Sequence, residues 1–270
     1  MTDVQAAAAR SVPLTRTPSW VVRARALVTS EWTKFWSVRS TSWMLLVMVI
    51  TPIMLGAIVA LVLVHGSGSP TDPLLPAFAS LDYAAIAACA LGVLQFSSEY
   101  STGLIRTTFI SVPQLRAVLA AKGIVTGGVT LVAGESIAFV SFFVDQAILH
   151  THHQGVSLST HGVSGAVVAS GVVLFACAMM ALAFGVIVRH TAGGISAAIA
   201  VIVLPTILGL LPQPWGHRLA RFTLTNAAQQ VSVLHSSTDL FSPTFSMVVL
   251  LAWPAIPLIV ATVMITRSPT

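Results

Sequence analysis

Charged residues are scarce in this chain. Of its 270 residues only 8% are Asp, Glu, Lys or Arg, whereas soluble domains carry about 25%. With 56% hydrophobic residues, a water-soluble globule of this length would lack the polar side chains needed to cover its surface. The composition therefore excludes a cytosolic enzyme, a nucleic-acid-binding domain and a disordered chain. We attribute the net charge of +5 to basic residues around membrane spans rather than to a nucleic-acid partner.

Catalytic motifs and disulfide frameworks are missing as well. The two cysteines, Cys89 and Cys177, lie in separate apolar runs outside any metal-ligand spacing, so we interpret them as buried thiols. The sequence has no Gly-x-x-x-x-Gly-Lys-Ser/Thr loop to hold ATP phosphates. It also has no Gly-x-Ser-x-Gly turn and no His-Glu-x-x-His helix. We therefore expect no catalytic site, no metal site and no cofactor bound by this chain.

Long uncharged apolar runs, by contrast, are abundant. A helix needs about 20 apolar residues to cross the hydrocarbon core of a membrane. Six candidate spans satisfy or approach this length: residues 43–64, 83–98, 123–144, 162–188, 191–211 and 245–266. The run 83–98 is the shortest and is rich in alanine. The sequence therefore predicts an all-α integral membrane protein with a six-span transmembrane domain over residues 42–267.

The basic residues indicate how such a chain is oriented. Six spans place both ends of the chain on one side of the membrane, and eleven of the thirteen Lys and Arg residues fall on that side. The opposite side holds only Arg218 and Arg221. Because short cytoplasmic loops are rich in Lys and Arg, we expect a multi-pass protein of the plasma (inner) membrane with both termini cytoplasmic.

The region before the first span divides into two parts. Residues 1–18 are mainly Ala, Thr, Ser, Pro and Arg, which predicts a disordered tail. Residues 19–41 predict a basic amphipathic helix in the membrane interface. Its apolar residues recur at helical spacing: Trp20, Ala24, Leu27, Val28, Trp32, Phe35 and Trp36. Such a helix is either a plain anchor or an elbow helix that also contacts a cytoplasmic partner.

Two loops are long enough to have a role of their own. The inner loop 99–122 is broken at Gly103 and Pro113, which predicts two short helical pieces with a bend. A compact protrusion of this kind could transmit force from a docked partner. The outer segment 212–244 mixes aromatic and basic residues. It predicts either an interfacial or re-entrant helix pair over the outer mouth, or an ordinary amphipathic surface loop.

Glu135 lies near the middle of the third predicted span. An isolated charge there costs about 2.5–3.5 kcal/mol, so this carboxyl group should be protonated, paired or exposed to a wet cavity. We consider it a candidate for the translocation path, or alternatively a neutral glutamic acid that helps helices pack. Asp145 is nearer the outer end, where we expect it to be solvated. Four outer histidines, His150, His152, His153 and His161, are interpreted as a polar loop rather than a metal site.

Four segments, taken in order and spacing, resemble the permease subunit of ABC-2 type transporters, of the short actinobacterial form. These are SEWTKFWSVRST at 30–41, EYSTGLIRTT at 99–108, VPQLR at 112–116 and AAK at 120–122, followed by a Trp- and Pro-containing outer segment. The resemblance covers nearly the whole chain from about Arg25. The chain has no large extracellular domain, which argues against the mechanotransmission type.

The resemblance implies a six-span permease that pairs with a second copy or a close paralogue. Two copies of a separate cytoplasmic P-loop ATPase would hold ATP and Mg²⁺ and drive export of an amphipathic or hydrophobic compound (a drug, lipid or peptide). It further implies that the first and fifth spans form much of the permease–permease contact. The residues implied in ATPase coupling are Glu31, Lys34, Glu99, Gly103, Arg106, Arg116 and Lys122. Trp215 and Phe222 would belong to an outer gate.

Two other functions fit the same pattern of spans. One is an ion-coupled secondary transporter that uses Glu135 as its proton or cation site. The other is a membrane scaffold or sensor protein that transports nothing.

Overall fold

The computed structural model describes residues 20–66, 72–101, 115–212, 214–234 and 241–267, and over these residues the chain is helical with no strands. The helices are α1 (Trp20–Ser37), α2 (Arg39–His65), α3 (Leu75–Ser101), α5 (Leu115–His150), α6 (Val163–Val188), α7 (Thr191–Leu208), α8 (Trp215–Ala220), α9 (Leu224–Ser232) and α10 (Pro243–Arg267). Six of them, α2, α3, α5, α6, α7 and α10, are long and apolar enough to cross a membrane. The number of predicted spans is therefore confirmed. The predicted disordered tail 1–18 lies outside the described residues.

Several helices extend beyond the predicted apolar runs. Helix α3 begins at Leu75 rather than at residue 83, and α5 begins at Leu115 rather than at residue 123. The physical reason is that a gap between charges marks the hydrocarbon core, whereas helical hydrogen bonding continues into the interface and beyond it. As a result Glu99, Arg116 and Lys122 are helical residues, and the predicted loop 99–122 is shorter at both ends. Its remaining part, 102–114, lies outside the described residues.

Helix α6 lies at the centre of the bundle. It packs against α3, α5, α10, α7 and α9, and small residues let its backbone come close to its neighbours. At the α3–α6 crossing, a Cβ added to Gly92 would collide with the carbonyl oxygen of Ala178. Small residues at helix contacts are typical of membrane bundles, where close van der Waals packing replaces the hydrophobic effect.

Helices α2, α7 and α10 form the periphery and leave apolar faces uncovered. In α7 only Gly194 and Ala198 are buried, although the helix is as apolar as the central ones. Ile58 on α2 and Ile256 on α10 are likewise exposed. These faces must be covered by lipid or by another protein chain.

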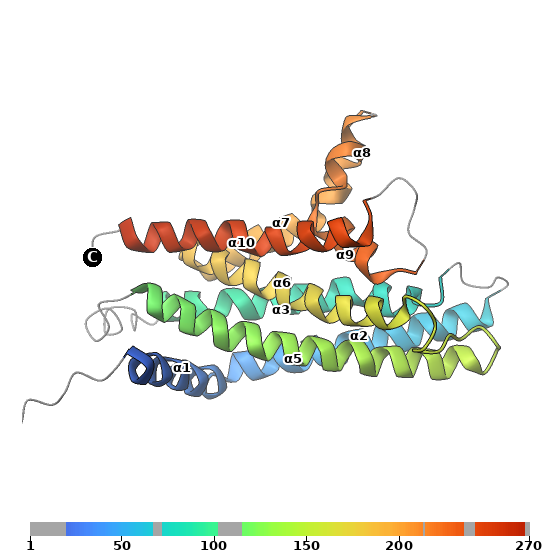
Figure 1. The fold of residues 1–270 in the computed structure, drawn as a ribbon, viewed down its shortest axis with the longest axis horizontal. Coiled ribbons are helices and arrows are strands. Elements are labelled where there is room, and N and C mark those ends of the chain that lie inside the picture. The colour runs from blue at the N-terminus through green and yellow to red at the C-terminus, as the bar shows by residue number, and fades with distance from the viewer. Residues whose placement is uncertain (1–19, 67–71, 102–114, 213, 235–240, 268–270) are drawn as a thin grey trace, which may run out of the picture.

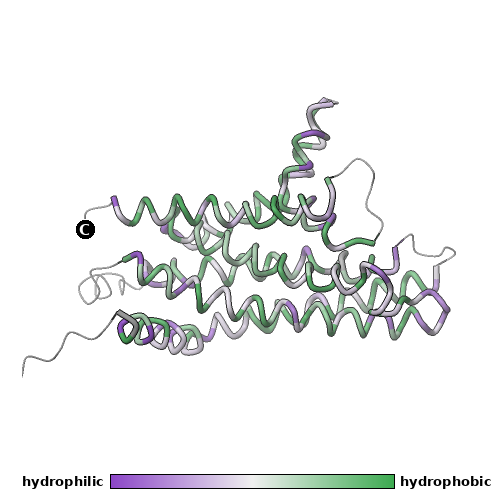
Figure 2. Tube along the Cα trace, viewed as in Figure 1, coloured by the Kyte–Doolittle hydropathy of each residue, from purple (hydrophilic) through white to green (hydrophobic). Residues whose placement is uncertain are grey.

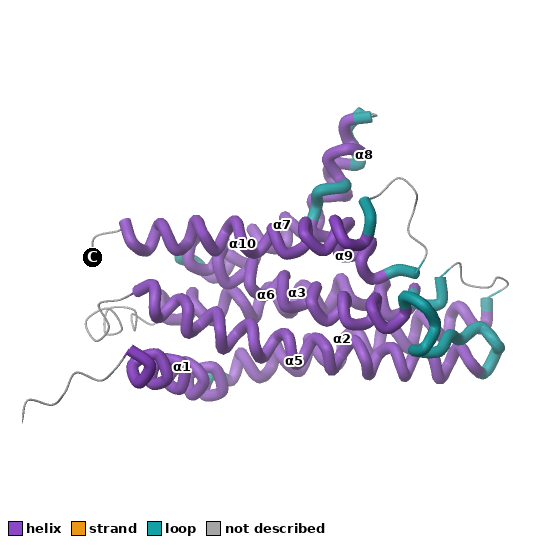
Figure 3. The backbone as a smooth tube through the Cα atoms, viewed as in Figure 1, coloured by secondary structure: helices purple, strands orange, loops and turns teal. Residues whose placement is uncertain are grey.

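The long helices run roughly along one direction, so the bundle has two distinct ends (Figure 1). We call the end that holds α1, the C-terminus of α10, the end of α3 and the start of α5 the terminal end. The opposite end, here the loop end, holds the end of α2, the start of α3 and the connection α5–α6, and α8 and α9 lie toward it (Figure 3). Hydrophobic residues follow the long helices, whereas hydrophilic residues gather on α1 and near helix ends (Figure 2). This distribution is the one expected of a bundle that spans a membrane.

Candidate functional site: a charge cluster at the terminal end

Four charged side chains from three helices meet at the terminal end. Lys122 Nζ on α5 lies 2.6 Å from Glu31 Oε2 on α1 and 2.8 Å from Glu99 Oε1 in α3. Lys34 Nζ on α1 lies 2.7 Å from Glu31 Oε1 and 3.2 Å from the same Glu99 oxygen. Each lysine thus bridges both carboxylates. We call these four residues the charge cluster.

The charge cluster is largely withdrawn from water. Glu31 is 4% exposed, Lys122 3% and Glu99 7%. Removing such ions from water costs several kcal/mol each, and mutual attraction compensates only where the geometry is good. Here two carboxylates face two ammonium groups, so the cluster is neutral as a whole. Losing one member would leave a buried, uncompensated charge.

Lys34 is the most accessible member of the charge cluster. Burial lowers the pKa of its ammonium group, but hydrogen bonds to Glu31 and Glu99 and the charges of both carboxylates outweigh burial and raise that pKa above its ordinary value of 10.5. The ammonium group is therefore fully charged at neutral pH, where it balances the second carboxylate.

One face of α1 holds the helix against the bundle. Val28, Glu31 and Phe35 recur at helical spacing, and Phe35 is 1% exposed in a small core with Leu91 of α3 and Val125 of α5. After Ser37 the chain turns at Val38, whose backbone is extended, before α2 begins. A glutamate thus lies in the middle of the buried face of α1.

The predicted apolar face of residues 19–41 is divided by this arrangement. Phe35 faces the bundle, but Trp32 and Trp36 are about half exposed and stack edge to face with ring centroids 5.8 Å apart. Indole rings in this position suit the membrane interface. The helix ends at Ser37 rather than at residue 41. Glu31 lies on the side of the helix that faces the bundle, not on the exposed side.

The remaining residues predicted for ATPase coupling are not part of the charge cluster. Arg116 is exposed in the first turn of α5, on a different side of the helix from Lys122. Gly103 and Arg106 lie outside the described residues. The structure therefore brings together Glu31, Lys34, Glu99 and Lys122.

Glu135 lies near the middle of α5, as predicted. It is half-buried, and its carboxyl group covers Gly171 of α6 so closely that a Cβ on that glycine would lie 2.5 Å from Glu135 Cδ. Among the described residues no hydrogen bond or ion pair reaches this carboxyl group. Glu135 therefore remains a candidate for a functional role within the membrane.

The expectation that Asp145 is solvated is wrong. This residue is 1% exposed, because α5 continues past it to His150 and its side chain faces α2. A Cβ on Gly56 of α2 would lie 2.9 Å from both carboxyl oxygens. Neither oxygen has a hydrogen-bond partner within the described part of the chain. Asp145 is thus a second carboxyl group in candidate span α5, and it is more deeply buried than Glu135.

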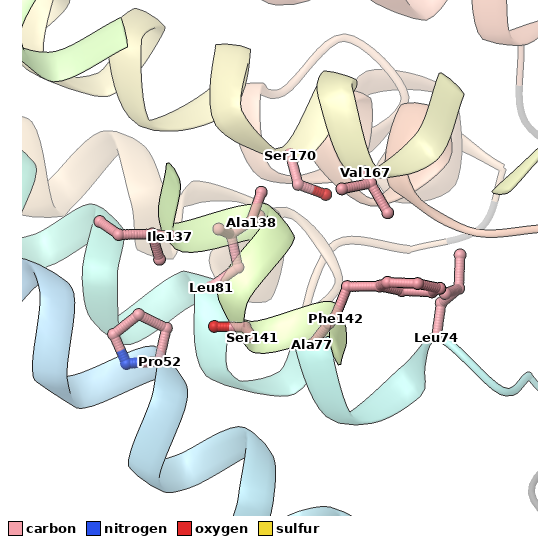
Figure 4. Close-up of a pocket in the computed structure, with 10 residues that line it drawn as sticks. All are labelled: Pro52, Leu74, Ala77, Leu81, Ile137, Ala138, Ser141, Phe142, Val167 and Ser170. Carbon is pink, nitrogen blue, oxygen red and sulfur yellow. The ribbon is translucent and has the colours of Figure 1, made fainter. Parts of the chain in front are cut away.

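A small cavity lies next to this contact, between α2, α3, α5 and α6 (Figure 4). Its volume of about 20 Å³ is enough for about one water molecule. Ser141, one turn before Asp145, directs its hydroxyl group toward Pro52, and that hydroxyl also has no partner among the described residues. The cavity is far too small for an amphipathic compound, so it is not a translocation path within one protomer.

The predicted outer segment contains two short helices, α8 and α9. Helix α9 is anchored by buried residues such as Leu224 and Val231 and packs on α10 and α6, whereas α8 stands away from the bundle (Figure 1). Trp215 on α8 is 65% exposed. The ring centroid of Phe222 lies 4.9 Å from that of Phe241. The role of Trp215 and Phe222 in an outer gate stays a prediction.

No protein-family model and no curated protein matches the chain. Its function must therefore be derived from the arrangement of its own residues. The most specific arrangement is the charge cluster, because it joins three helices that are far apart in sequence.

Proposed function

We propose that this chain is the permease subunit of an ABC-2 type exporter. Two permeases pair in the plasma membrane, and two copies of a separate cytoplasmic P-loop ATPase bind ATP and Mg²⁺ and power them. The complex exports an amphipathic or hydrophobic compound such as a drug, a lipid or a peptide. The chain itself is not an enzyme, which agrees with the lack of a phosphate-binding loop in its sequence.

The charge cluster is the observation that carries this proposal. It fastens α1, which lies outside the spanning bundle, to the last turn of α3 and the first turns of α5. An ATPase that contacts α1 or the α3–α5 link would therefore move two spanning helices together.

Basic residues support a cytoplasmic position for the terminal end. The described basic residues of this end are Arg23, Arg25, Lys34, Arg39, Arg116, Lys122, Arg189 and Arg267. The loop end has Arg218 and Arg221. This asymmetry follows the positive-inside rule and supports a cytoplasmic position of the charge cluster, within reach of an ATPase.

The uncovered apolar faces of α2 and α7 suit a contact between two permeases. The cavity between α2, α3, α5 and α6 in the described part of the chain holds only about 20 Å³, so we place the path for a large compound between two chains. Phe222 and the short helices α8 and α9 at the loop end would then close the outer mouth of that path.

The proposal is tested by reconstituting the purified chain in liposomes, alone and with a candidate P-loop ATPase partner. We expect ATP-dependent export of a fluorescent amphiphile only when both are present, and ATP hydrolysis stimulated by the permease. Flux through the permease alone would contradict the proposal. Hydrolysis that no permease or amphiphile alters would indicate a scaffold or sensor instead.

Glu135 supports a second candidate, an ion-coupled carrier, because its half-buried carboxyl group has no partner among the described residues. The two functions predict different responses to Glu135→Gln and to an ionophore that collapses the ion gradient. We expect export to continue at near wild-type rate after either treatment, as long as ATP is supplied. Loss of export under both treatments would favour the carrier.

A further inference from the structure

A groove of about 540 Å³ runs along the outer side of α5, between α6 and α10. Its floor is formed by three glycines of α5, Gly123, Gly127 and Gly128, and its walls include Phe175 of α6 and Leu258 of α10. The groove lies on the surface of the bundle, because Gly128 and other α5 residues along it are exposed. It is separate from the charge cluster, from the cavity near Ser141 and from the faces of α2 and α7.

Two of the three glycines of this groove, Gly123 and Gly128, are not used for contact between helices of this chain, whereas Gly127 packs on α6, where an added Cβ would lie 2.9 Å from the ring of Phe175. Gly-x-x-x-Gly spacing usually lets two helices come together closely. Here a Cβ added to Gly128 would meet nothing within 4 Å, and one added to Gly123 would meet only the end of Met179 at 3.5 Å. The missing side chains therefore leave an open channel on the lipid-facing surface.

The groove has the length and polarity of one membrane leaflet. The fifteen residue steps from Arg116 to Leu131 correspond to about 22 Å of helix. One leaflet measures about 20–22 Å, of which about 15 Å is hydrocarbon and the rest is the headgroup region. Arg116 is exposed at the terminal end of the groove. Thr262 is the other polar residue that lines the groove. Its hydroxyl group donates a 2.7 Å hydrogen bond to the backbone carbonyl of Leu258.

We propose that this groove binds one anionic phospholipid from the leaflet at the terminal end. One acyl chain lies over the glycine floor, and the lipid phosphate contacts the guanidinium group of Arg116. Basic sites between spanning helices at this depth select anionic headgroups, and arginine binds phosphate with two parallel hydrogen bonds. The proposal stands independently of the transport function.

A second copy of the chain fits the groove less well than a lipid. A volume of about 540 Å³ falls in the range of small-molecule sites, roughly 300–1,000 Å³. An apolar helix would also leave Arg116 without an anion.

Native mass spectrometry of the full chain with equimolar phosphatidylglycerol and phosphatidylcholine tests the proposal. We expect one phosphatidylglycerol to be retained per chain in preference to phosphatidylcholine. Arg116→Gln should reduce that preference about fivefold, whereas Arg116→Lys should retain most of it. Gly128→Leu should weaken binding of both lipids by at least about tenfold, since its side chain replaces the acyl chain along the floor.

Arg39→Gln is the matched control, because Arg39 is also exposed at the terminal end but lies on α2, away from the groove. It should leave the lipid preference unchanged. The proposal is overturned if Arg39→Gln reduces the preference as much as Arg116→Gln does, since the effect would then be diffuse surface charge. It is equally overturned if Gly128→Leu binds lipid like the wild type, or if this variant changes only the oligomeric state.

Discussion

Replacing Lys122 with Met is expected to lower the free energy of unfolding by about 3–5 kcal/mol. Methionine keeps the unbranched apolar part of the side chain but removes the ammonium group that lies 2.6 Å from Glu31 and 2.8 Å from Glu99. Two buried carboxylates would then share only Lys34, which is 45% exposed at its side chain. Denaturant titration in mixed micelles measures the loss, and protease cleavage after α1 should become faster because the helix separates from α5.

Arg116→Met provides the control on the same helix, since that side chain is exposed and outside the charge cluster. Its effect should stay within about 0.5 kcal/mol. The double variant Glu31→Gln with Lys122→Met leaves one carboxylate and one ammonium group, so it should be less destabilised than the sum of its single changes. If Lys122→Met proves as mild as Arg116→Met, the charge cluster does not hold α1.

Gly92→Ala is expected to destabilise the bundle by about 1–3 kcal/mol or more, because overpacked cores force the backbone to shift. The new methyl group would overlap the carbonyl oxygen of Ala178 and lie 3.0 Å from the amide nitrogen of Leu182. Both are backbone atoms of the central helix α6, so no rotation of a side chain relieves the contact. The same titration in mixed micelles measures this effect.

Gly128→Ala makes the same chemical change on α5, but its effect on the free energy of unfolding should have the opposite sign. Its Cβ has open space, and alanine favours a helix over glycine by about 0.5–1 kcal/mol. We therefore expect a small gain in stability. Equal losses for both variants would mean that α3 and α6 do not cross as closely as the structure shows.

The number of spans was predictable because apolar length has a simple physical cause. A run such as 162–188 must be long enough to cross the hydrocarbon core, and α6 occupies almost the same residues. The helix ends were less predictable. Leu75 and Leu115 begin helices outside the apolar runs, because a helix continues wherever its backbone hydrogen bonds continue.

The candidate site was predicted only in part. The resemblance to ABC-2 permeases implied seven coupling residues, of which Glu31, Lys34, Glu99 and Lys122 form the charge cluster, but it did not show that these four touch. Glu31 and Lys122 are 91 residues apart, and no periodic pattern relates two such distant positions. The one local signal was that Glu31 shares a helical face with Phe35.

The prediction for Asp145 was wrong because its burial depends on a neighbouring helix. Its position near the end of an apolar run suggested contact with water, whereas its exposure depends on Gly56 of α2, which lets that helix come close. Pairing between helices decides such cases, and the sequence of one helix does not contain this information. The apolar groove beside Arg116 could not be predicted from the sequence for the same reason.

Central to the account is the idea that the charge cluster carries movement of the ATPase to α3 and α5. The most direct test is the number of ATP molecules hydrolysed per amphiphile exported by the reconstituted complex carrying Glu99→Gln. We predict that hydrolysis continues while export falls about tenfold or more, and that adding Lys34→Gln, which restores neutrality, recovers part of the export. An unchanged ratio of hydrolysis to export in Glu99→Gln would contradict the account.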